Sequence, residues 1–521
     1  MQGRTCSPDF RGLKRLLAAA LVAALTACAG GPQPPDTYTP SQTAEMFHAV
    51  LTAIETNYIE RQDVETLTLS ALEAINEIDP GFTVDAEEGT TLLIYQDKEV
   101  FRADIPSEER IDLWALQADQ ILAAARSVSK RLRETSDEDL YDAMFGSMVG
   151  LLDRYTRYAG AQEAQSNRES RQGFGGIGVS VGAHPLGARV LTVTPGHPAQ
   201  AAGIHGGDVL VSIDGRSLAG TPLRQIIRQL RGPVEKPVVL GISRAGLQTP
   251  ITVTVGRTHI VPNTVFFTPR GKAAVIRITA FNDRTPKRVA EAVSESQATL
   301  GPDMIGFILD LRGNPGGLLD KAIDVADLFL HSGRISSTDG RNPRSFQDFL
   351  AEPGDISFGK PVAVLVDGAT ASAAEVLAAA LQDQGRAVLI GSSTFGKGTV
   401  QTVLDMPNGG ELILTWARLL APSGYVLHEA GVMPTICSQG SVPADSLLRH
   451  VLLVEPATTI HNLALRRRIG PNEPAAREHV ATLCPWRPED GPDRAADAAL
   501  RLLESPDLYQ TAITLELPPA S

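Results

Sequence analysis

A serine and a lysine stand at two short turns of the stretch VDGATASAAEVLAAALQDQGRAVLIGSSTFGKGTVQT, residues 366–402. Ser372 follows a turn of small residues, and Lys397 stands between Gly396 and Gly398. A serine hydroxyl is a weak nucleophile at neutral pH and needs a base. A lysine near apolar strands is desolvated, which lowers the pKa of its amine so that the amine can accept a proton. Ser372 and Lys397 are therefore candidates for a nucleophile and its base.

Other interpretations of the same residues stay open at this point. Most lysines are solvated surface charges, and glycine-bearing turns are common in α/β folds. None of the ten histidines lies within residues 366–402, and His331 and His428 are the nearest in sequence. That distance does not exclude a histidine triad, but it offers no support for one. A phosphate-binding loop is the remaining alternative, although neither the dinucleotide nor the Walker pattern is complete.

Two stretches share one layout, in which a strand runs into a turn and then into a helix. They are FILDLRGNPGGLLDKAI, which contains Gly316 and Gly317, and AVLVDGATASAAEVL, which contains Ser372. The unpaired amides at the start of a helix favour negative charge. The two turns together could therefore stabilise an oxyanion.

The elements that carry these turns alternate between strand-like and helical patterns. From about residue 262 to 439, AAVIRI, MIGFILDL, PVAVLV, RAVLIG and ELILTWARLL are strand-like, and RVAEAVSESQATL, LLDKAIDVADLFL and SAAEVLAAALQD are helical. This alternation predicts βαβ units and a largely parallel sheet. Short Val/Ile-rich runs between glycine turns, with one helix at LRQIIRQL, predict a β-rich module before it.

The chain as a whole is predicted to be a multidomain α/β protein. Two helices are expected within residues 43–79, a hairpin at TTLLIYQDKEVFRADIP, and further helices within residues 109–152. The expected order is a mainly helical domain with this inserted hairpin, the β-rich module, the βαβ core and a C-terminal extension that mixes turns and helices. Their expected bounds are 43–170, 171–258, 259–440 and 441–521.

Three motifs in the βαβ region resemble those of the C-terminal processing peptidases, also called tail-specific proteases. The motifs are LDLRGNPGGLL, GATASAAEVLAAALQDQGRAVLIG and TFGKGTVQ, and the resemblance extends from about Tyr141 to Pro434. It implies a crotonase-like peptidase core in which a Ser/Lys dyad cleaves peptide bonds near protein C-termini. The nucleophile then falls on Ser372, the base on Lys397, and the glutamine that positions the lysine on Gln401.

The same resemblance implies roles for residues around the dyad. The N–H of Ala373, with that of Gly316 or Gly317, would form the oxyanion hole, and Asp383 matches an acidic residue of structural role. The chain departs from the family in modest ways: the frequent GSASASE is ATASAAE here, and the frequent DPHS is DRYT at residues 153–156. Residues 83–135 resemble an insertion.

The β-rich module resembles a PDZ domain, with GFGGIGVSV as its carboxylate-binding loop. Successive amides at Gly175, Gly176, Ile177 and Gly178 could bind a chain-terminal carboxylate, while the following strand pairs with the peptide backbone. Taken alone, such glycines are also typical of an ordinary turn.

The first residues have the pattern of an export signal. Arg4, Arg11, Lys14 and Arg15 precede an apolar run, Leu16 to Leu25, that is too short to span a bilayer comfortably. The following LTAC resembles a bacterial lipobox, which implies a signal peptide at residues 1–27 and lipidation of Cys28. Ala29 at the next position resembles lipoproteins sent to the outer membrane of Gram-negative bacteria. Residues 28–42 would be a tether, and the rest would lie in the periplasm; a buried N-terminal helix is the alternative.

Charge and cysteines limit the remaining partners. Removal of residues 1–27 takes away four basic side chains and one acidic one, so the net charge changes from −13 to −16, which argues against nucleic acid. Cys437 and Cys484 could form one disulfide in an oxidising compartment or remain two buried thiols. No cysteine and histidine cluster has zinc-ligand spacing, so neither a metal nor a cofactor is implied.

These features predict an anchored periplasmic serine endopeptidase that holds substrate tails through its PDZ domain. An adaptor lipoprotein and a cell-wall hydrolase substrate are partners that the resemblance implies. One alternative is a catalytically vestigial PDZ scaffold lipoprotein, which intact Ser372, Lys397 and Gln401 disfavour. Another is an acyl-CoA-processing enzyme on a related α/β layout, which would need a cytoplasmic cofactor supply that the export signal disfavours.

Overall fold

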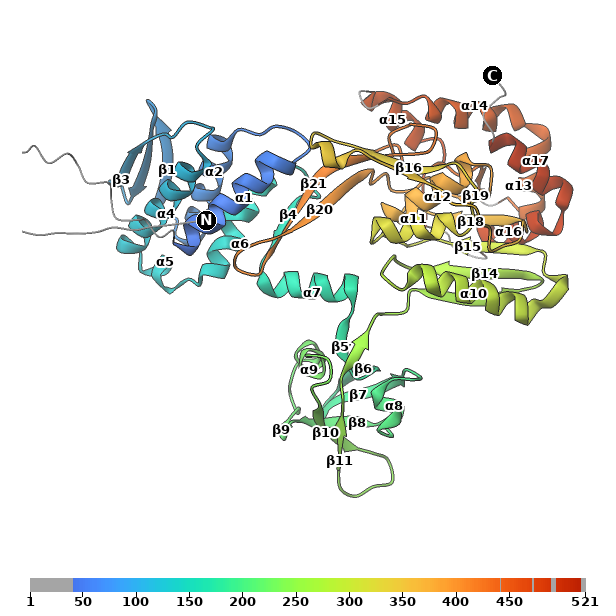
Figure 1. Cartoon of the computed structure of the whole chain (residues 1–521), viewed down its shortest axis with the longest axis horizontal. Helices are drawn as coiled ribbons and strands as arrows, with labels where there is room; N and C mark the ends of the chain where they lie inside the picture. Colours follow the sequence, from blue (N-terminus) through green and yellow to red (C-terminus); the bar gives the residue numbers. More distant parts are fainter. Residues whose placement is uncertain (1–40, 441, 471–472, 489–492, 517–521) are drawn as a thin grey trace, which may run out of the picture. The chain divides into compact units, whose positions relative to one another are not determined.

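The structure, a computed structural model, describes residues 41–440, 442–470, 473–488 and 493–516 (Figure 1). The predicted signal peptide and Cys28 lie outside these ranges, as does most of the predicted tether. Within them, no helix combines the length and the apolar character that crossing a membrane requires.

The N-terminal part is mainly helical, as predicted. Its helices are α1 (Gln42–Asn57), α2 (Val64–Glu73), α3 (Ile75–Ile78), α4 (Ile111–Val128), α5 (Lys130–Glu134) and α6 (Asp137–Gly150). Ser41 and Asp63 cap α1 and α2 by accepting a backbone N–H of the first turn. Buried side chains such as Phe47, Trp114 and Phe145 form their common core.

The predicted hairpin is present, and one further strand joins it. Strand β2 (Thr90–Tyr95) pairs antiparallel with β3 (Lys98–Asp104), and β1 (Phe82–Glu87) pairs with the other edge of β2. The sequence did not predict β1, because only Phe82 and Val84 of its six residues are buried and the apolar alternation is too short to recognise.

Strand β4 (Arg157–Ala159) and helix α7 (Ala161–Gln172) lead into the β-rich module. The module contains β5 (Phe174–Gly176), β6 (Val179–His184), β7 (Gly187–Val193), α8 (Pro198–Ala201), β8 (Val209–Ile213), β9 (Arg216–Ser217), α9 (Leu223–Leu230), β10 (Val238–Ser243), β11 (Ile251–Val255) and β12 (Thr258–Ile260). The main path of its sheet has the order β11-β10-β8-β7-β6, so β6 lies at an edge. Strands β5 and β12 pair where the chain enters and leaves the module.

The βαβ core is built on a sheet of order β13-β14-β15-β18-β19-β22 (Figure 1). Its elements are β13 (Val265–Arg270), β14 (Ala273–Ile278), α10 (Thr285–Leu300), β15 (Gly306–Asp310), α11 (Leu319–Asp327), β18 (Val362–Val366), α12 (Ala373–Asp383), β19 (Val388–Gly391) and β22 (Ile436–Cys437). Strands β14 to β22 along this order are parallel, and β13 is antiparallel. Strands β15, β18 and β19 are wholly buried, which explains their continuous apolar runs.

One predicted member of the parallel sheet lies elsewhere. ELILTWARLL forms β21 (Glu411–Leu420), which belongs to a second, antiparallel sheet with β17 (Gln347–Leu350), β16 (Arg334–Asp339) and β20 (Thr399–Asp405). The prediction was wrong here because a short turn, closed by the Met406 N–H to Gly410 carbonyl bond, joins β20 to β21. Parallel neighbours would need a long crossover. Strand β4 also pairs with β21.

The C-terminal extension is helical and packs on the core. It contains α13 (Ala444–Arg449), a π-helical turn (His450–Val454), α14 (Pro456–Arg467), α15 (Pro474–Ala481), α16 (Arg494–Glu504) and α17 (Pro506–Glu516). Helices α16 and α17 cover the sheet face opposite α12 with residues such as Leu502 and Leu515. A disulfide joins Cys437 to Cys484, which decides between the two alternatives left by the sequence.

Asp383 fastens the C-terminal end of α12. Its side chain is 2% exposed and accepts from the Ser423 N–H and hydroxyl at 3.1 and 2.6 Å and from Arg467 Nε at 3.0 Å. It stands at the opposite end of α12 from Ser372, so its contacts are those of a structural residue.

Candidate active site

Ser372 stands in a sharp turn between β18 and α12. One oxygen of Asp367, Oδ1, accepts the N–H groups of Ala369 and Thr370 at 3.0 and 2.9 Å and so shapes the turn. Ser372 itself has φ +58° and ψ −122°, a conformation that non-glycine residues rarely adopt. Such strain at a strand-to-helix turn is how other α/β enzymes project a nucleophilic serine.

The two predicted turns are in direct contact. The Asp367 carboxylate also accepts the Gly313 N–H at 3.0 Å, and the Ala371 N–H donates to the Asn314 carbonyl at 2.9 Å. A Cβ on Gly316 would lie 2.9 Å from the Ser372 Cβ, so only glycine allows this approach. The structure thus brings RGNPGG against the serine.

The amides of the two turns differ in whether they already donate a hydrogen bond. The Gly316 N–H donates to the side chain of the buried Asn314 at 2.8 Å, so it is occupied. Among the described residues, no hydrogen bond uses the N–H of Gly317 or Ala373 as its donor. Of the two glycines that the sequence left open, Gly317 is therefore the better candidate, together with Ala373.

A buried carboxylate, Glu375, joins the serine turn to the lysine turn. Its Oε2 accepts the N–H of Ser372 at 2.7 Å and that of Lys397 at 2.9 Å. Its Oε1 accepts the Gly396 N–H at 2.7 Å and the Thr394 hydroxyl. Burial raises the pKa of Glu375, and these four donors oppose that rise. Glu375 was not among the residues predicted from the sequence, although the Ser-x-x-Glu spacing of a capping box was a signal.

Lys397 is half-buried between glycines that permit a close backbone approach. A Cβ on Gly398 would lie 1.9 Å from the backbone nitrogen of His428. Burial and the charge of Arg157 lower the pKa of Lys397, while Asp153 and Glu375 oppose the shift. Its Nζ lies 5.0 Å from the centroid of the Tyr155 ring. In the described part of the chain, no hydrogen bond joins Nζ to the Ser372 hydroxyl.

Among the described residues, no hydrogen bond joins Gln401 to Lys397. On strand β20, its Nε2 donates to the hydroxyls of Thr399 and Thr415 at 2.9 and 3.2 Å. The Thr415 hydroxyl in turn donates to Asp153 Oδ1 at 3.1 Å. This chain of hydrogen bonds links Gln401 to the turn that carries Tyr155.

The four predicted carboxylate-loop residues divide between a strand and a turn. Gly175 and Gly176 lie in β5, paired with β12, whereas Ile177 and Gly178 form the turn before β6. The carbonyls of Ile177 and Gly178 accept the N–H groups of Ala199 and Thr194, and the Ile177 side chain is buried. These contacts hold the turn at the start of the edge strand β6.

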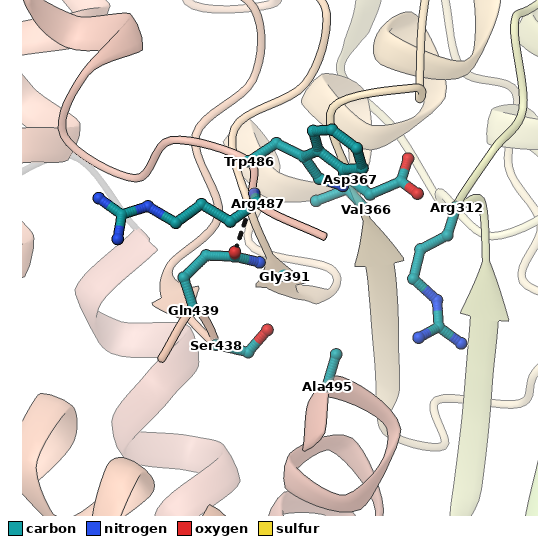
Figure 2. Close-up of a pocket in the computed structure, with 9 residues that line it drawn as sticks. All are labelled: Arg312, Val366, Asp367, Gly391, Ser438, Gln439, Trp486, Arg487 and Ala495. Carbon is teal, nitrogen blue, oxygen red and sulfur yellow. Dashed lines mark hydrogen bonds between the residues drawn. The ribbon is translucent and has the colours of Figure 1, made fainter. Parts of the chain in front are cut away.

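A cavity of about 190 Å³ lies at the carboxyl ends of β18 and β19 and is lined partly by the C-terminal extension. Figure 2 shows the Trp486 indole near Val366 and Asp367, and the bond from the Arg487 N–H to Gln439 Oε1. Ser372 and Lys397 do not line it. Trp486 of the extension packs against Gly368, in the turn that leads to Ser372. Among the described residues, no group of three or more His, Cys, Asp or Glu side chains is arranged to hold a metal ion.

Replacement of Glu375 by glutamine tests its role in holding the two turns together. One oxygen becomes a donor, which leaves buried N–H groups unpaired. We expect a loss of about 2 kcal/mol or more in the free energy of unfolding, measured with urea. Displacement of the site by about 1 Å should lower peptide cleavage roughly 100-fold. The exposed helical Glu295→Gln serves as the control; wild-type cleavage by Glu375→Gln would contradict this role.

Comparison with known proteins places these features in a family. The model of peptidase family S41 matches residues 272–438, and the PDZ domain model matches residues 163–243. The carboxy-terminal-processing protease of Bartonella bacilliformis is 37% identical over 59% of this chain and 71% of its own length. The carboxy-terminal processing protease CtpA of Bacillus subtilis is 34% identical over 58% of this chain and 65% of its own.

A further relative and a solved structure are similar over comparable lengths. The carboxyl-terminal-processing protease of Picosynechococcus is 35% identical over 58% of this chain and 74% of its own length. The photosystem II D1 C-terminal processing protease aligns with 71% of this chain and 92% of its own, at 26% identity and a TM-score of 0.36. The family models and the curated relatives show that the chain belongs to peptidase family S41, the C-terminal processing serine proteases, and that it carries a PDZ domain.

Proposed function

We propose that Ser372 and Lys397 are the catalytic dyad of this protease and that its PDZ domain holds the C-terminal tail of a protein substrate. The main support for the dyad is that one oxygen of the Glu375 carboxylate accepts the backbone N–H of both Ser372 and Lys397. Such a link fixes the serine and lysine turns relative to each other.

In the proposed mechanism, neutral Lys397 takes the proton of the Ser372 hydroxyl as the oxygen attacks the substrate carbonyl. The amides of Gly317 and Ala373 stabilise the negative charge on the carbonyl oxygen, a contribution of about 3 kcal/mol per donor in comparable sites. Lys397 then gives the proton to the leaving amine, and water releases the acyl group from Ser372. The lowered pKa of Lys397 increases the share of the neutral amine at any given pH.

Ser372→Ala and Lys397→Ala should abolish peptide cleavage without loss of folding, and Lys397→Arg should be equally inactive because a guanidinium stays charged. In the wild type, kcat/KM should rise with pH as Lys397 loses its proton. Since burial lowers the lysine pKa, the midpoint of this acid limb of the pH profile should lie below the ordinary lysine pKa of about 10.4. The measurement is the pH dependence of cleavage, with circular dichroism to check folding.

A folded Ser372→Ala or Lys397→Ala variant with full activity would refute the dyad. A serine-directed covalent probe separates the protease from a vestigial scaffold, since only a reactive Ser372 is labelled. No label on a wild-type chain that still binds tails would favour the scaffold.

The PDZ domain offers an edge strand for the substrate tail. Strand β6 lies at the edge of its sheet, helix α9 packs beside it, and the Ile177–Gly178 turn leads into it. A peptide can add to such an edge by main-chain hydrogen bonds, with its terminal carboxylate at the turn amides. This geometry supports recognition of tails.

A peptide with a free C-terminus should bind Ser372→Ala more tightly than the same peptide with a C-terminal amide, because the amide carries no charge. We expect a difference of about tenfold, in line with one charge-assisted contact. Fluorescence anisotropy measures it in the full chain, and a peptide of scrambled internal sequence with a free carboxylate serves as the control. Equal affinities would exclude carboxylate recognition.

We further propose that the protein is exported and held at a membrane surface in the periplasm by a lipid on Cys28. The support is the cationic start, the short apolar run and LTAC in the sequence. Fatty-acid labelling in cells should mark the wild type and not Cys28→Ala, and the variant should leave the membrane fraction. Equal labelling of both would contradict the anchor.

A further inference from the structure

Tyr155 places an aromatic face beside the Lys397 amine. The distance from Nζ to the ring centroid is 5.0 Å, within the range of a cation–π interaction. Among the described residues, Nζ makes no hydrogen bond or ion pair. The cation–π contact with this ring is therefore the interaction that the structure shows for the amine, and the ring comes from DRYT, one of the two segments that depart from the family pattern.

The backbone at Tyr155 is held in place by hydrogen bonds of its own turn. Asp153 Oδ1 accepts the N–H of Tyr155 at 2.8 Å and of Thr156 at 3.1 Å, and Oδ2 accepts the Thr156 hydroxyl at 2.7 Å. The Thr415 hydroxyl on β21 ties Asp153 to the antiparallel sheet, and Gln401 Nε2 binds that same hydroxyl. Gln401 thus reaches Lys397 through Thr415, Asp153 and Tyr155.

Charged groups from several elements face this contact. Arg157 of β4 disfavours the protonated lysine, and Asp153 and Glu375 favour it. Around the ring, the Arg154 guanidinium lies 4.9 Å from the centroid, and His428 meets the ring edge-on at 6.1 Å. Burial lowers the pKa of His428, beside which Glu429 lies, and burial raises the pKa of Tyr155, so the ring stays a neutral phenol.

An aromatic face attracts an ammonium group but has no comparable attraction for a neutral amine. The proposed dyad needs the neutral amine at Ser372, whereas the structure has Nζ at the ring. We propose that Tyr155 is a positioning residue that holds protonated Lys397 in the resting enzyme and releases it toward Ser372 once the proton has left to water. The inference rests on the proposed Ser372/Lys397 dyad.

The test compares rings of equal shape and different electron density at position 155 of the full chain. Fluorination of a phenylalanine ring draws electron density from its face, so a series from Tyr155→Phe to increasingly fluorinated phenylalanines weakens the cation–π contact with little change in size. Each step should favour the neutral lysine and move the acid limb of kcat/KM to lower pH. Tyr155→Leu and Tyr155→Met should move it furthest, by roughly one pH unit, whereas Tyr155→Phe should keep the wild-type limb.

Controls separate this role from packing. Tyr95→Leu removes a ring whose centroid lies 4.4 Å from that of the Phe82 ring. It should therefore lower the urea midpoint of unfolding and leave the acid limb of kcat/KM in place. A limb that stays fixed across the fluorinated series, or moves as far in Tyr155→Phe as in Tyr155→Leu, would overturn the inference. If the Ser372 and Lys397 variants are inactive but the limb stays fixed across the variants at position 155, only this role of Tyr155 is refuted. An active Lys397→Ala would refute the dyad itself.

Discussion

The candidate active site depends on one buried carboxylate. Glu375 is fully buried, and its oxygens accept three backbone N–H groups and one hydroxyl from two separate turns. Burial of a carboxylate is costly unless hydrogen bonds replace its lost water, and here four donors do so. Because the same oxygen binds the amides of Ser372 and Lys397, neither turn can shift without breaking a bond to a buried group. The proposed nucleophile and its proposed base, which stand on two separate turns, are thereby held in fixed relative positions.

The small residues around this frame follow from how closely its parts approach. Helix α12 is buried along nearly its whole length, and its alanines allow contact with the sheet and with α11. Gly316 and Gly398 stand where a side chain would overlap the Ser372 Cβ or the His428 backbone. The composition that first looked like ordinary α/β packing is therefore also a requirement of the site.

The lysine half of the site is shared between parts of the chain. Strand β4 pairs with β21, which brings Asp153, Tyr155 and Arg157 from beside the helical part to Lys397 on the peptidase core. Two of the charged residues that act on the pKa of the lysine, Asp153 and Arg157, therefore come from outside the βαβ core, whereas Glu375 belongs to it. A change in the β4 segment is therefore expected to alter the pKa of Lys397 without replacing Ser372 or Lys397.

The sequence by itself determined the order of the elements, the core strands and the candidates Ser372 and Lys397, because apolar periodicity, turn residues and family motifs are local signals. It did not determine that β21 leaves the parallel sheet, that Cys437 pairs with Cys484, or that Gln401 meets Thr415 rather than the lysine. Glu375 and Tyr155 also gained their roles only in the folded chain. These outcomes depend on which distant residues packing brings within hydrogen-bond or ring-contact distance, and only the tertiary structure sets those distances.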